Sequence, residues 1–153
     1  MESNHGGNIL QILSDLPAFI QRPILQNKLR EFLLMDDESK YETISMVMKS
    51  AFSVETRKLS ELTSIWMDIL CSLDGCEIVN ILKMYLDEIL RNQMTIENLS
   101  HEPLITGFMN LSDKNKEKFT DSLKEAIFLY PKAAEALLII PKPFLIIIGV
   151  RYS

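Results

Sequence analysis

Hydrophobic residues recur along most of this chain at steps of three and four positions, the spacing that lines one face of an α-helix. Ile78, Ile81, Leu82 and Tyr85 form one such stripe, with polar residues such as Lys83 between them. The pattern predicts an all-α chain with helices over residues 8–20, 23–33, 37–52, 56–70, 76–91, 103–109, 113–130 and 133–140.

Prolines set several of the expected helix ends, because proline lacks a backbone N–H and disfavours helix in the residue before it. Pro17 should kink or end the first helix near residue 15 or 16, and Pro23 should be the first residue of the second helix. Pro131 should stop the helix that begins near residue 113. The run at residues 144–148 is rich in β-branched side chains and fits a strand as well as a helix.

Three short hinges interrupt the helical pattern at a constant spacing. Their central residues, Met35, Leu73 and Leu111, follow one another at steps of 38 residues. An aspartate or a serine after each hinge can accept a hydrogen bond from the first turn of the next helix. Hydrophobic positions before and after the hinges keep the same step, so the hinges and both flanking stripes share one register.

This register predicts a single all-α domain over residues 1–153, built from helical hairpins that each bury a stripe on the next. The architecture is then a short right-handed solenoid or a compact multi-helix bundle. The repeat length is similar to those of tetratricopeptide and HEAT-type arrays, but the Trp-Leu-Gly-Tyr signature of the former is absent. The expected units are a half-unit, three hairpins and a second half-unit, over residues 8–21, 22–55, 56–93, 98–131 and 132–150.

Composition and charge exclude several classes of protein. The chain has 153 residues, of which 47% are hydrophobic and 24% charged, values far from those of a disordered protein. A net charge of −5 argues against a general nucleic-acid-binding surface, which needs clustered lysine and arginine. No stretch reaches the ~18 uninterrupted apolar residues of a membrane-spanning helix. The start of the chain does not resemble a secretory signal, so we expect a cytoplasmic protein with reduced thiols.

The two cysteines, Cys71 and Cys76, flank the central hinge and are the candidate redox residues. Their spacing is neither that of a redox motif nor that of a zinc knuckle. By register, Cys71 falls among apolar residues and should be buried, whereas Cys76 falls among charged residues and should face water. We therefore expect no disulfide between them, and Cys76, in the first turn of a helix, is the more reactive candidate.

No catalytic, cofactor-binding or metal-binding residue is expected. The chain has no glycine-rich phosphate loop, nucleophile elbow or zinc-binding helix motif. The acidic cluster Asp36, Asp37 and Glu38 lies where helix caps belong and lacks the alternating ligands of a calcium loop. His101, next to Glu102, is interpreted as an ordinary loop histidine.

The sequence therefore favours a non-catalytic interaction or scaffold module of the helical-hairpin type, with a protein or peptide as its partner. Two alternatives stay open. One is a small thiol-based redox sensor or enzyme that uses Cys76. The other is a membrane-peripheral protein anchored by the C-terminal apolar run.

That run, residues 144–150, contains no charge, although helical arrays usually end in a polar cap. By register, Ile146 and Ile147 should pack on the preceding unit. Phe144, Leu145 and Ile148 would then face water and favour association. We expect a second copy of the chain to cover these three side chains around a two-fold axis, which would make the protein a homodimer.

Overall fold

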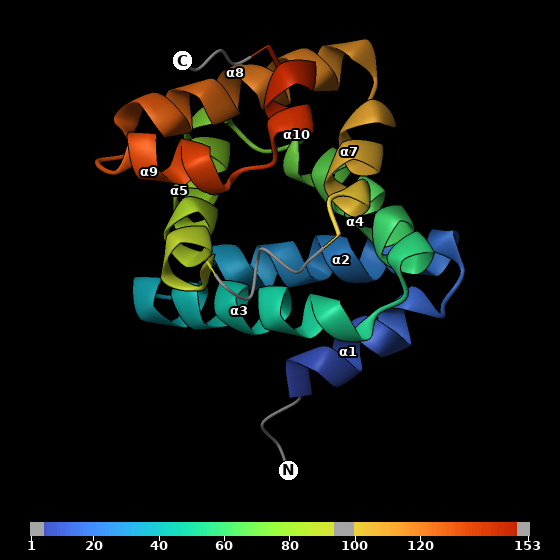
Figure 1. Cartoon of the computed structure of the whole chain (residues 1–153). Helices are drawn as coiled ribbons and strands as arrows, with labels where there is room; N and C mark the ends of the chain where they lie inside the picture. The colour runs from blue at the N-terminus through green and yellow to red at the C-terminus, as the bar shows by residue number, and fades with distance from the viewer. Residues whose placement is uncertain (1–4, 94–99, 150–153) are drawn as a thin grey trace.

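The computed structural model describes residues 5–93 and 100–149, with side chains from residue 10 onward. Every regular element in these two ranges is helical, so the expected all-α class is confirmed (Figure 1). A 3₁₀ turn, η2 (Ala51–Ser53), follows the third helix. The α-helices are α1 (His5–Ser14), α2 (Ala18–Leu33), α3 (Asp37–Ser50), α4 (Thr56–Leu70), α5 (Gly75–Arg91), α7 (Glu102–Met109), α8 (Asp113–Leu129), α9 (Ala133–Ile139) and α10 (Lys142–Ile147).

The pair α4 and α5 occupies the middle of the molecule (Figure 1). Helix α4 contacts both α2 and α7, and α5 contacts both α3 and α8. At the two ends, α1 covers α3 and α4, while α9 packs on α5 and α8, and α10 packs on α7. Because the middle pair is covered on several sides, its residues form the centre of the core. Its side chains Leu70, Ile78 and Leu86 are among the most completely buried in the core.

Helices α4 and α7 approach each other closely at Gly107. A Cβ atom at this position would lie 2.7 Å from the Sδ atom of Met67 and 3.0 Å from the Cγ2 atom of Thr63. A glycine inside a helix costs about 1 kcal/mol relative to alanine. Here the absence of a side chain lets the two helices touch, and the buried Met67 fills the space.

The three turns between the paired helices have the same backbone hydrogen bond. In each turn the N–H of the central residue, Met35, Leu73 or Leu111, donates to the carbonyl oxygen three residues earlier, at 3.1 Å. Each of these residues is followed by one in an extended conformation, after which the next helix begins. The three turns therefore redirect the chain in the same local way.

The extended residues are the N-caps that the sequence predicts. The side chain of Asp36 accepts a hydrogen bond from the backbone N–H of Ser39 at 2.8 Å, and this bond lowers the pKa of the Asp36 carboxyl. The hydroxyl of Ser112 accepts from the N–H of Asn115 at 3.2 Å. Asp74 occupies the same position before α5, but its side chain makes no capping hydrogen bond.

The second helix does not begin at Pro23. It begins at Ala18, because Pro17 is extended and its carbonyl oxygen accepts the N–H groups of Ile20 and Gln21. Pro23 therefore lies inside α2, in its second turn. The prediction failed because the chain becomes helical again directly after Pro17. Only three residues separate the end of α1 from the start of α2.

The sequence left strand and helix open for the C-terminal run, and in the structure this run forms the short helix α10. Phe144, Leu145 and Ile148 point into the core and are 2%, 0% and 3% exposed. The expectation that these three residues form an interface with a second copy is therefore wrong, because the chain itself covers them. Pro141 caps α10 and accepts its first backbone bonds, so the helix starts afresh and the register of the earlier units does not continue into it.

The side chains expected to pack inward are the ones that face out. Ile146 is 72% exposed and Ile147 is 39% exposed. The inward side of α10 is held by Phe144, whose ring lies 6.0 Å from that of Phe108 and 6.5 Å from that of Phe119. These edge-on contacts join α10 to both α7 and α8.

In the described part of the chain, none of the helices has the length and apolar character needed to cross a bilayer.

The close contact between α4 and α7 predicts that Gly107→Val will lower the free energy of unfolding by about 2–3 kcal/mol, because the added side chain overlaps Met67. The matched change is Gly75→Val, at a glycine where an added Cβ would have no atom within 4 Å. This control should change the free energy of unfolding by less than about 0.5 kcal/mol. Urea denaturation of the two variants tests this. Equal losses at the two sites would contradict a tight contact at Gly107.

Candidate functional site

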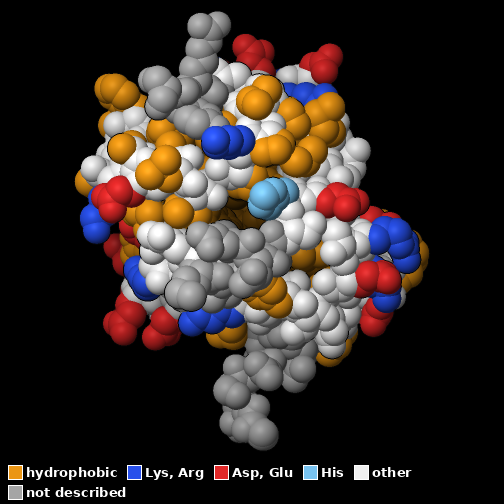
Figure 2. Space-filling model, in the orientation of Figure 1, with side chains coloured by type: hydrophobic (Ala, Val, Ile, Leu, Met, Phe, Trp, Pro, Cys, Tyr) orange, Lys and Arg blue, Asp and Glu red, His pale blue; other side chains and the backbone are white. Residues whose placement is uncertain are grey.

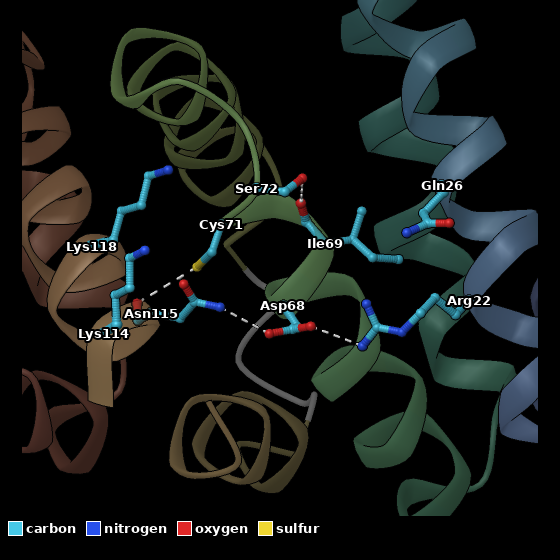
Figure 3. A pocket seen from close by; sticks show the side chains of 9 residues that line it. All are labelled: Arg22, Gln26, Asp68, Ile69, Cys71, Ser72, Lys114, Asn115 and Lys118. Carbon is cyan, nitrogen blue, oxygen red and sulfur yellow. Dashed lines mark hydrogen bonds and ion pairs between the residues drawn. The ribbon is translucent and has the colours of Figure 1, made fainter. Parts of the chain in front are cut away.

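A pocket lies where α2, α4 and the first turns of α8 meet, beside the turn between α4 and α5 (Figure 3). Its volume is about 400 Å³, within the range of small-molecule sites. Two residues from α2, two from α4, two from the turn and three from α8 line it: Arg22, Gln26, Asp68, Ile69, Cys71, Ser72, Lys114, Asn115 and Lys118.

Asp68 is the centre of the polar network in this pocket. The Nη2 atom of Arg22 donates to its Oδ2 atom at 2.8 Å, and the Nδ2 atom of Asn115 donates to its Oδ1 atom at 3.0 Å. Both oxygens of the carboxylate are therefore engaged, and the network joins α2, α4 and α8 (Figure 3).

Lys114 and Lys118 add two positive charges on the α8 side of the pocket. They are four residues apart on one helix, so their side chains lie on one face (Figure 3). Neither ammonium group makes a hydrogen bond or an ion pair within residues 10–93 and 100–149. Since Asp68 balances Arg22, the pocket lining has an excess of two positive charges in a chain whose net charge is −5.

Cys71 contributes a buried thiol to the pocket wall. It is 2% exposed, and its Sγ atom lies 3.6 Å from the carbonyl oxygen of Asn115, to which it donates. The pKa of the Cys71 thiol is raised to about 11, chiefly by burial and in smaller part by nearby Asp68, while Lys118 opposes the rise. At neutral pH this group is a protonated thiol and a poor nucleophile.

The second cysteine stands apart from this site. Cys76 is exposed in the first turn of α5, and both cysteines are free. The burial of Cys71 and the exposure of Cys76 agree with the sequence-based expectation. Because one thiol is enclosed beside Asn115 and the other faces water, the structure does not bring the two candidate redox residues together into one site.

A second aspartate, Asp87 of α5, joins α3 to the end of α8. The hydroxyl of Tyr41 donates to Asp87 at 2.8 Å, and the hydroxyl of Tyr130 donates to its other oxygen at 2.6 Å. The bond to Asp87, followed by burial, raises the pKa of Tyr41; burial, followed by the same kind of bond, raises the pKa of Tyr130. Asp87 therefore acts as a shared acceptor between α3 and the end of α8.

The neighbouring Glu88 is a buried carboxylate at 1% exposure. Asn92 donates to one of its oxygens, and the other, Oε1, lies 3.8 Å from Arg91 and accepts no hydrogen bond. Adjacent positions on a helix point apart, and Asp87 and Glu88 accordingly have different hydrogen-bond partners.

Sequence reasoning missed most of the pocket. Arg22 and Asn115 lie 46 and 47 residues away from Asp68 in the sequence, so no local pattern links these side chains. Only the fold brings these side chains together, since α2 packs on α4 and the first turn of α8 reaches Asp68 through Asn115. His101 lies just before α7 and is exposed, as expected of a loop histidine.

Comparison of the chain with known protein families, with curated protein sequences and with solved structures gives no match. Within the described residues, no group of three or more histidine, cysteine or acidic side chains is placed to hold a metal ion.

The shared acceptor predicts a strong dependence of stability on Asp87. Asp87→Ala should lower the free energy of unfolding by about 1–3 kcal/mol, because it leaves the buried Tyr130 hydroxyl without its acceptor. Tyr130→Phe should cost about 0.5–1.5 kcal/mol, and the double variant should cost less than the sum. Urea denaturation of the three variants measures the coupling. Strictly additive losses would mean that the two groups do not interact.

The contrast between the two thiols is also testable. Near pH 7.5, iodoacetamide should add one alkyl group to the folded protein, at Cys76, because Cys71 is buried and its pKa is about 11. The rate at Cys71 should rise only as the pH approaches that pKa. Mass spectrometry of the native protein counts the groups, with Cys76→Ser as the control that takes none. Two groups on the native wild type would contradict the burial of Cys71.

Proposed function

We propose that this chain is a non-catalytic interaction or scaffold module whose C-terminal end binds a helical protein partner. The observation that carries this proposal is that each of three successive helices has at least one large apolar side chain that is mostly exposed. Phe128 of α8, Leu138 of α9 and Ile146 of α10 are 85%, 81% and 72% exposed. Figure 2 shows hydrophobic side chains gathered on the upper half of one face, over α9 and α10.

The array of paired helices supports this role. Helices α3, α5 and α8 begin at residues 37, 75 and 113, at the same steps of 38 residues as the turns that precede them. This regularity favours a stack of helical hairpins, either as a short right-handed solenoid or as a compact bundle. In such a stack each unit contacts its neighbours, so the last unit keeps one face without a neighbour.

The form of the stack also indicates the chemistry of the partner. Along the chain, helices are covered by further helices, as α4 is by α7 and α5 is by α8. A partner that continues the stack would present the apolar face of a helix to α9 and α10. Burying the three exposed side chains would contribute about 5–8 kcal/mol before the costs of association.

No comparable arrangement favours the thiol-based alternative. Cys71 is enclosed and has a pKa of about 11, and the two cysteines are free, one buried and one exposed. A function that uses Cys76 alone would depend on that side chain's exposure and its place in the first turn of α5.

Replacement of Leu138 and Ile146 by lysine should abolish partner binding without unfolding the protein, because both side chains are largely exposed. The control is Ile12→Lys/Phe19→Lys, which changes two exposed apolar residues at the other end of the chain. Crosslinking in native extract, followed by quantitative mass spectrometry, compares the proteins captured by each form.

A partner retained by the wild type and the control, and reduced at least about tenfold for the C-terminal variant, would support the proposal. A partner captured equally by all three forms would overturn it. Sedimentation of the purified wild type identifies the remaining case, in which the helical partner is a second copy of the chain.

A further inference from the structure

We propose that the pocket between α2, α4 and α8 binds a phosphate monoester, with Lys114, Lys118 and Arg22 as the charged contacts. The ligand class follows from the balance of donors and acceptors in the pocket (Figure 3). This site lies on different residues from the apolar surface described above and does not depend on it.

The charged acceptor in the pocket, Asp68, is already engaged. The two oxygens of Asp68 accept from Arg22 and Asn115, at 2.8 and 3.0 Å. The hydroxyl of Ser72 donates to the carbonyl oxygen of Ile69 at 2.6 Å, so its proton is held within the wall. A cationic ligand would therefore compete with existing bonds for the carboxylate, whereas an anionic ligand would not.

The donors, in contrast, have capacity left. The ammonium groups of Lys114 and Lys118 each present three donors, and neither makes a hydrogen bond or an ion pair in the described part of the chain. Arg22 uses one Nη2 contact for Asp68 and keeps further N–H groups for another partner. Charge-assisted bonds of this kind are the strong ones in phosphate recognition.

The shape of the site fits a small molecule that bears the phosphate. The volume of about 400 Å³ exceeds what a phosphate group alone needs, and the side chain of Ile69 gives the pocket an apolar wall. The three cations come from both sides, since Arg22 lies on α2 and the two lysines lie on α8 (Figure 3). A dianion between them would neutralise the two unpaired positive charges.

The test is a titration with glycerol 3-phosphate at constant ionic strength, followed by ¹H–¹⁵N NMR of the full chain. The wild type should show saturable shifts at the amides of residues 71–72 and 114–118, and glycerol alone should produce none. Lys114→Gln/Lys118→Gln should raise the Kd at least about tenfold. The control, Lys49→Gln/Lys132→Gln, removes the same charge at two lysines that do not line the pocket and should keep the wild-type Kd.

Absence of saturable shifts in the wild type would overturn the proposal, as would an equal loss of affinity in the control. A second arm distinguishes the source of the phosphate monoester. Sedimentation with phosphatidic acid vesicles, compared with phosphatidylcholine vesicles, tests a lipid headgroup. Binding of glycerol 3-phosphate without binding to the vesicles identifies a soluble ligand, and binding of both identifies the headgroup. Thermal unfolding confirms that each variant is folded.

Discussion

The packing of α7 on α4 through Gly107 is the contact on which the rest of the structure depends. Because position 107 carries no side chain, the two helices meet closely over Met67 and Thr63. This contact fixes where α7 lies, and the turn at Leu111 then sets where α8 begins. The first turns of α8 form one side of the polar pocket, α9 packs on α5 and α8, and α10 packs on α7, so the geometry of both regions follows from this approach of two backbones.

The middle pair of helices also carries two aspartates that join neighbouring helices through side-chain hydrogen bonds. Asp68 on α4 and Asp87 on α5 each accept two hydrogen bonds from partners 43–47 residues away in the sequence. Neither bond set lies in the centre of the apolar core. They lie at partly buried positions, where they add directional contacts between helices to the non-directional apolar packing.

The sequence was sufficient for the class of fold and for features that depend on local chemistry. Helical periodicity and the caps at Asp36 and Ser112 depend on short-range spacing, and the structure agrees with them. Features that depend on how separate helices meet could not be predicted in the same way. The partners of Asp68 are distant in the sequence, and the direction of α10 is reset by Pro141.

The aromatic cluster beneath α10 has a consequence for the order of folding. A six-residue helix is not stable by itself, so α10 needs the rings of Phe108 and Phe119 as a surface on which to form. Those two rings come from α7 and α8 and face each other at 6.0 Å only after the turn between these helices has closed. We therefore expect the insertion of Phe144 to follow the pairing of α7 and α8 when the protein folds.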